Sequence, residues 1–218
     1  MNKLKKERNL VQIILDEKTI NGNLTVPEDA KSIVLFAHGS GSSRFSPRNR
    51  YVAELMNKKG IGTLLIDLLT AEEEAVDEYT GQFRFDVGLL AERLVFSTKW
   101  LKTNSATKKL RIGYFGASTG AAAALIAAAK LPEEIAAVVS RGGRPDLAGE
   151  SLAKVRAPTL LIVGGIDIEV LQLNREALEL IHAEKKLEIV PGASHLFEES
   201  GKLEEAAALA INWFTRHL

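Results

Sequence analysis

The 218-residue sequence has no cysteine, no net charge and no long apolar run. Without cysteine the chain forms neither disulfides nor thiolate metal sites, and this absence is compatible with a cytoplasmic protein. Its 28 basic residues balance 28 acidic ones, so no global field favours nucleic acid or an anionic membrane as a partner. No apolar run approaches the roughly 20 residues of a membrane span.

Several motifs of targeting and of nucleotide binding are also missing. Residues 1–9 lack the apolar core of a secretory signal. The chain contains no Gly-Lys-Ser or Gly-Lys-Thr of a phosphate-binding loop. A dinucleotide site requires an acidic residue near the end of its second strand, and the matching strand here ends in Arg141. We therefore expect a soluble cytoplasmic protein that binds neither nucleic acid nor membrane.

Short apolar runs alternate with helical patterns along the chain. The strand-like runs are residues 10–15, 24–26, 32–37, 62–68, 110–112, 136–140, 158–163 and 187–190, and the longest helical patterns are 85–103, 172–182 and 202–217. This alternation predicts a mostly parallel sheet with helices on both faces. Residues 18–23, which include Asn21-Gly22-Asn23, are typical of a turn, so the first two strands predict an antiparallel N-terminal edge. We expect a single α/β domain over residues 1–218.

The run Gly116-Ala-Ser-Thr-Gly120 lies between an apolar strand and an alanine-rich helix. G-x-S-x-G in this setting predicts a nucleophile elbow, in which a strained turn lifts the serine hydroxyl above the sheet. The two glycines fit a helix that folds back directly against its strand. Ser118 is therefore the candidate nucleophile, with a plain glycine-rich turn as the alternative.

A serine nucleophile needs a base, and the base needs an orienting acid. Around this type of turn the chain order is Ser, then Asp or Glu, then His. Of the four histidines, only His195 lies in a loop directly after the last strand, and Asp167 follows the strand before it. Glu169 is the fallback acid. Asp167 also fits a helix N-cap, and His195 fits an ordinary surface loop.

The segment His38-Gly-Ser-Gly41 follows the third strand-like run. The oxyanion hole of such an arrangement uses the amide after the nucleophile and an amide from an earlier strand-end loop. We assign these donors to Thr119 and Ser40. His38 is expected to have an orienting, structural role.

Taken together, these motifs resemble the α/β-hydrolase superfamily, and more closely its dienelactone hydrolase-like branch. The matching motifs are His-Gly-Ser-Gly, Gly-Ala-Ser-Thr-Gly, Gly-Gly-x-Asp and a terminal Gly-x-x-His. The resemblance implies an α/β-hydrolase fold with Ser118, His195 and Asp167 as the catalytic triad. True dienelactone hydrolases use a cysteine nucleophile, so a serine here favours esterase-type chemistry. Apolar Ile166 and Ile168 flank Asp167, where polar residues or proline are less surprising.

The predicted substrate is a small soluble ester, and the predicted chemistry needs no metal and no organic cofactor. The interval between residues 140 and 158 is too short for a large lid, so we expect an open site. Strand-end loops hold arginines that fit either a substrate anion or a local acid such as Asp146. The candidate substrate-binding residues are Arg44, Arg141, Arg144 and Phe197, with Arg48, Phe45 and Leu196 as further loop residues.

Two other functional classes remain open from the sequence. The first is a non-catalytic or weakly active binding or scaffold protein, natural or engineered, that keeps the fold, because fold does not fix function. The second is an acyltransferase or peptidase that uses the same three residues. A broken triad or a blocked pocket would indicate the first class. The sequence leaves the oligomeric state open.

Overall fold

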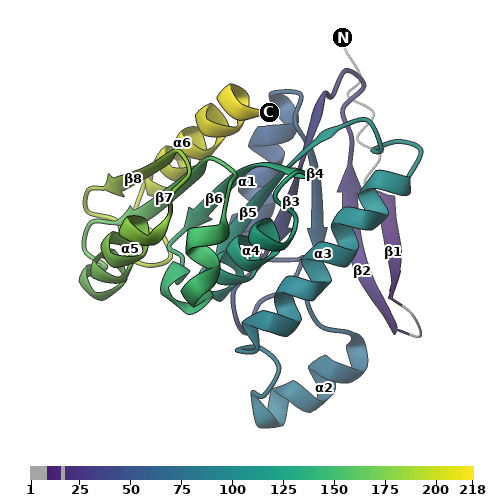
Figure 1. Ribbon diagram of the computed structural model, residues 1–218, viewed down its shortest axis with the longest axis horizontal. Helices are drawn as coiled ribbons and strands as arrows, with labels where there is room; N and C mark the ends of the chain where they lie inside the picture. The colour runs from purple at the N-terminus through teal and green to yellow at the C-terminus, as the bar shows by residue number, and fades with distance from the viewer. Residues whose placement is uncertain (1–8, 16–17) are drawn as a thin grey trace.

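The computed structural model describes residues 9–15 and 18–218. It contains an eight-stranded sheet in the order β1-β2-β4-β3-β5-β6-β7-β8 (Figure 1). The strands are β1 Asn9–Leu15, β2 Lys18–Thr25, β3 Ser32–Ala37, β4 Gly62–Ile66, β5 Arg111–Ala117, β6 Ile135–Arg141, β7 Thr159–Gly164 and β8 Lys185–Val190. The helices are α1 Pro47–Lys58, α2 Ala71–Thr80, α3 Val87–Thr103, α4 Thr119–Lys130, the 3₁₀ segment η1 Pro145–Lys154, α5 Ile168–Leu180 and α6 Lys202–His217.

Helices cover both faces of the sheet, as the sequence predicts. α3, α4, α5 and η1 pack on one face, and α1 and α6 pack on the other (Figure 1). The central strands are buried on both sides, and every residue of β3 and β4 is buried. Their continuous apolar sequences are the consequence of this double covering.

The strands from β3 to β8 run parallel, and β1 and β2 form an antiparallel edge. This confirms the expected fold class. The turn predicted at residues 18–23 is wrong, because Lys18–Thr25 forms one strand in which Gly22 pairs with Ile66. A side chain at Gly22 would meet Leu64 at 3.0 Å and Val11 at 3.2 Å. Gly22 is therefore a close-packing position inside a strand and not a turn residue.

The acid-rich segment that follows β4 is a helix, α2, which lies beyond the carboxyl ends of the strands (Figure 1). Thr70 and Glu73 form a capping box at its start. Glu73 is buried, and its carboxylate pairs with Arg93 and Lys18, each at 2.7 Å. These ion pairs tie α2 to α3 and to β2.

Two further helical features differ from expectation, an earlier start of α5 and a 3₁₀ segment where the sequence predicts no helix. α5 begins at Ile168, four residues before the predicted start at 172, and residues 145–154 form the short 3₁₀ segment η1. Neither forms a lid over the sheet. No helix in the described ranges is both long and apolar enough to cross a membrane.

The backbone passes very close to itself at the crossing from β5 to α4. A Cβ at Gly116 would lie 2.4 Å from the Cα of Ala121, and a Cβ at Gly120 would lie 2.4 Å from the carbonyl oxygens of Ala37 and His38. Real Cβ atoms do not approach backbone so closely. The two glycines therefore let α4 start directly against the ends of β5 and β3.

We expect Gly116→Ala to lower the free energy of unfolding by about 3 kcal/mol, because the methyl group meets backbone that has no room to move. Gly88→Ala in α3 is the matched control. Its Cβ would have only the Asp86 carboxylate nearby, at 3.3 Å, and it gains helix propensity, so its stability stays within about 1 kcal/mol of the parent. Urea denaturation of both variants checks this. Parent-like stability of Gly116→Ala would contradict the close crossing.

Candidate active site

Ser118 lies in the turn between β5 and α4 with a backbone conformation that serine rarely adopts. Its φ is 51° and its ψ is −125°. Among the described residues only Phe197 shares a positive φ without being glycine. Ser118 stands at the N-cap position of α4, yet its side chain makes no capping hydrogen bond. Such strain persists only where the surroundings impose it, and it leaves the half-buried hydroxyl uncommitted.

His195 and Asp167 are joined by a short hydrogen bond. The imidazole Nδ1 lies 2.7 Å from Oδ2 of Asp167. Asp167 does occupy the N-cap position of α5, but its carboxylate caps no amide there. The carboxylate accepts from the imidazole instead, so the N-cap alternative does not account for this side chain. The fallback acid, Glu169, is exposed in the first turn of α5.

Two strand-end loops pack tightly to create this pair. The amide of Gly165 donates to Val190 at 2.8 Å, and the amide of Ile166 donates to Ala193 at 3.1 Å. A Cβ at Gly164 would lie 2.3 Å from the carbonyl oxygen of Ala193. The Gly-Gly sequence at the end of β7 therefore allows the loop that carries Asp167 to press against the loop that carries His195.

Gly142 links this pair to the serine. The Ser118 amide donates to the carbonyl of Arg141 at 3.4 Å. The next residue, Gly142, has φ 51°, and a Cβ on it would lie 2.9 Å from the carbonyl oxygen and 3.7 Å from Nδ1 of His195. Ser118 and His195 are not hydrogen-bonded to each other in this structure. Catalytic hydrogen bonds are often long without substrate and tighten when it binds.

The sequence interpretation overlooked Gly142. The Gly-Gly pair at positions 142 and 143, directly after a buried strand, was the available signal.

The two assigned oxyanion donors lie together, but one is engaged. The Ser40 amide donates to Oγ1 of Thr119 at 2.9 Å. Thr119 is the first residue of α4, so its own amide has no acceptor within the helix. A Cβ at Gly39 would lie 3.0 Å from Cβ of Ser118. The loop after β3 is thus in contact with the turn that carries Ser118.

His38 holds the loop after β3 through two hydrogen bonds. Its Nε2 accepts a hydrogen bond from the Leu68 amide at 3.1 Å. Nδ1 therefore carries the proton and donates to the carbonyl of Gly39 at 2.9 Å. Burial lowers the pKa of His38 below its usual value, which favours this neutral form. The bonds join the ends of β3 and β4, as the expected structural role requires.

Two of the candidate substrate-binding arginines have carboxylate partners within the chain. Arg44 pairs with Asp67 and also donates from Nε to Asn23 at 3.0 Å. Arg144 makes a two-point contact with Asp146, at 2.9 and 2.8 Å. The structural alternative considered for these arginines therefore accounts for both.

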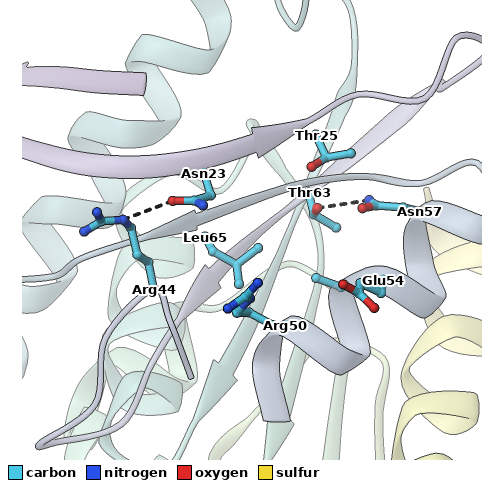
Figure 2. A pocket seen from close by; sticks show the side chains of 9 residues that line it. Asn23, Thr25, Arg44, Arg50, Glu54, Asn57, Thr63 and Leu65 are labelled. Atoms are coloured by element: carbon cyan, nitrogen blue, oxygen red, sulfur yellow. Dashed lines mark hydrogen bonds between the residues drawn. The ribbon is translucent and has the colours of Figure 1, made fainter. Parts of the chain in front are cut away.

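Figure 2 shows a pocket that Arg44 lines, between α1 and strands β2 and β4. The Arg44 guanidinium and the Asn57 amide bond to neighbouring side chains there, Asn57 donating to Thr63 at 3.0 Å. Neither Ser118 nor His195 lines this pocket. It is therefore separate from the candidate active site. In the described residues no three carboxylate or imidazole groups gather as ligands for a metal ion.

Arg141 has a different environment from the other arginines. It is buried, it lies 5.6 Å from the centre of the Phe197 ring, and its closest polar partner is Asn49 Oδ1 at 3.4 Å. Within residues 9–15 and 18–218, its Nε and Nη1 atoms have no hydrogen-bond partner. Burial, with a smaller contribution from Arg48, lowers its pKa to about 10. Phe197 is 1 % exposed and packs in the core under the loop that carries His195. It therefore offers no surface to a substrate.

With this geometry in place, residues 21–218 match the sequence profile of the dienelactone hydrolase family. The chain belongs to the dienelactone hydrolase family. A crystal structure of a dienelactone hydrolase from Anabaena variabilis is 57 % identical, with a TM-score of 0.96 over 98 % of this chain and 99 % of that one. Est1E from Butyrivibrio proteoclasticus has the same fold at 15 % identity, with a TM-score of 0.80 over 95 % and 98 % of the two chains. Family membership supports a hydrolase.

The chain also matches two proteins of Mycobacterium tuberculosis that are provisionally named phosphoribosyl transferases. Each is 57 % identical over 208 residues, which are 95 % of this chain and 46 % of the relative. The chain thus spans about half the length of these curated relatives.

The lowered pKa of His38 gives a testable pH dependence. Because the folded protein binds this proton less readily than the unfolded chain does, the contribution of His38 to stability is complete above pH 6.5 and is lost as the pH falls below that value. His38→Asn keeps an acceptor for the Leu68 amide but does not titrate. Urea denaturation across this range should show a steeper loss of unfolding free energy for the parent than for the variant. Equal slopes would contradict the assigned neutral state.

Proposed function

We propose that this protein is a serine hydrolase that transfers the acyl group of small esters to water. The observation that carries the proposal is the 2.7 Å hydrogen bond between His195 and Asp167, in strand-end loops of the same sheet whose strand β5 leads into a serine with φ 51°. Acyl transfer needs a serine hydroxyl as nucleophile, an imidazole as base and a carboxylate that orients the imidazole. The proposed triad is Ser118, His195 and Asp167.

In the proposed reaction, Ser118 Oγ attacks the ester carbonyl while His195 Nε2 takes the serine proton. Asp167 keeps Nδ1 protonated and stabilises the imidazolium that forms. The same imidazolium then gives its proton to the departing alcohol, which leaves an acyl group on Ser118. Water, deprotonated by His195, attacks this acyl group, and the carboxylic acid departs with the serine hydroxyl restored.

The proposed oxyanion hole combines the amides of Thr119 and Ser40. The Thr119 amide is already available at the start of α4, where the helix dipole also favours negative charge. The Ser40 amide becomes available when the Thr119 hydroxyl, its present acceptor, gives way to the oxyanion. No step in this mechanism requires a metal ion or an organic cofactor.

A second candidate comes from the name of the M. tuberculosis relatives. Since the chain matches only 46 % of each relative, we propose that the matched part is the hydrolase and that the activity in their name belongs to the remainder. Under the alternative, this chain would itself transfer a phosphoribosyl group. A further alternative is a scaffold protein that keeps the triad without turnover.

Labelling with a fluorophosphonate probe tests the activated serine. We expect labelling of the parent, none of Ser118→Ala, and hydrolysis of p-nitrophenyl acetate by the parent alone. Asp167→Asn should lower kcat by about 10⁴-fold, because it leaves the imidazole in the wrong tautomer. Glu169→Gln is the matched control, and it should retain parent-like kcat.

The outcomes separate the candidates. An unlabelled but folded parent, judged by its cooperative unfolding, would overturn the hydrolase proposal and leave the scaffold and the phosphoribosyl transfer alternatives. Labelling of Ser118→Ala would show that the probe reacts elsewhere. Equal losses in Asp167→Asn and Glu169→Gln would contradict the assignment of the acid.

A further inference from the structure

Most exposed large apolar side chains lie in segments that follow the carboxyl ends of the strands. Twelve large apolar side chains are exposed in the described part of the chain, and eight of them lie in the strand-end segments at the carboxyl edge of the sheet. These eight are Phe45, Val76, Tyr79, Phe85, Leu147, Ile166, Ile168 and Leu196. The remaining four lie on the edge strands β1 and β8 and at the end of α5. Exposed apolar residues that are scattered singly over a surface need no explanation, whereas a concentration at one edge indicates a binding surface.

Three of the eight adjoin the catalytic pair. Ile166 and Ile168, 60 % and 68 % exposed, flank Asp167, and Leu196, 39 % exposed, follows His195. The two loops that carry them are joined by the hydrogen bonds between residues 165–166 and residues 190–193. We call these three side chains the apolar ledge. Ile168 is the first residue of α5, a position where its β-branched side chain contributes nothing to the core.

The chemistry of the triad says which part of an ester the apolar ledge meets. The imidazolium must hand its proton to the oxygen of the departing alcohol, so the alcohol portion lies next to His195. The ledge borders His195 and its acid partner. A macromolecule seated on the same residues would crowd the neighbouring His195 and Asp167, which disfavours a permanent docking role.

We propose that the apolar ledge binds the alcohol portion of the substrate, and that this portion is a hydrocarbon group. The inference rests on the proposed hydrolase function and names the substrate class for that site: esters of apolar alcohols. It refines the expectation of small soluble esters, because the loops after β7 and β8 then favour a longer alkyl or aryl alcohol over methanol.

A series of alkyl acetates isolates this contact. Methyl, butyl and hexyl acetate all form the same acetyl-enzyme, so kcat/KM differs among them only through substrate binding and acylation, the steps in which the alcohol portion is present. We expect kcat/KM to rise along the series for the parent. Ile168→Ser should lower kcat/KM for hexyl acetate about tenfold, as loss of an apolar contact of this size does, and change methyl acetate less than about twofold.

Leu180→Ser is the matched control. Leu180 is 52 % exposed at the far end of the same helix, α5, so the variant loses an exposed apolar side chain without touching the ledge. It should behave like the parent with every acetate. Equal losses in the two variants, or a uniform loss across the series in Ile168→Ser, would overturn the proposal.

Binding of intact hexyl acetate to Ser118→Ala, followed by NMR titration, separates the failure of this proposal from failure of the hydrolase. Binding that weakens about tenfold when Ile168→Ser is added supports the ledge even if the parent proves inactive. Turnover by the parent with no chain-length dependence overturns the ledge and leaves the hydrolase intact. Light scattering provides the third arm, since a dimer that Ile168→Ser dissociates would reassign the ledge to contact between two copies of the chain.

Discussion

The near-contact of α4 with the ends of β5 and β3 is the constraint on which the site depends. Gly116 and Gly120 leave no room for a side chain, and between them Ser118 has φ 51°. This one passage places Ser118 directly after the end of β5, starts a helix whose first amide is Thr119, and brings the loop of Ser40 against the same turn. The strain at Ser118 is therefore held by packing around the turn, in a core that tolerates little adjustment.

Neutral and charged groups beneath the loops then fix the remaining geometry. Neutral His38 joins the ends of β3 and β4. Buried Arg141 lies against Phe197, two residues beyond His195, and has no carboxylate partner among the described residues. A buried cation without an anionic partner costs free energy. Arg141 differs in this respect from Arg44 and Arg144, whose charges are balanced by Asp67 and Asp146. The loops of the candidate site are thus supported by the neutral imidazole of His38 and by the buried guanidinium of Arg141.

The sequence predicted the fold class and the His195–Asp167 contact, because strand periodicity and chain order are local signals that the sheet topology brings to one edge. It failed where tertiary packing decided the outcome. Asn21-Gly22-Asn23 has turn composition, yet Gly22 serves close packing under Leu64. The engagement of the Ser40 amide by Thr119, the burial of Phe197 and the partners of each arginine depend on side-chain contacts between distant segments. The position of Ile168 was visible in the sequence, but its exposure was not.

The central claim is that Ser118 carries the acyl group during turnover. The most direct measurement is rapid acid quenching of the protein with p-nitrophenyl acetate, followed by mass analysis of the intact chain and of its peptides. The account predicts one acetyl group per chain, attached to Ser118, that appears before steady state and disappears when substrate is exhausted. Hydrolysis without an acetylated chain, or a transient acetyl group on another residue, would contradict it.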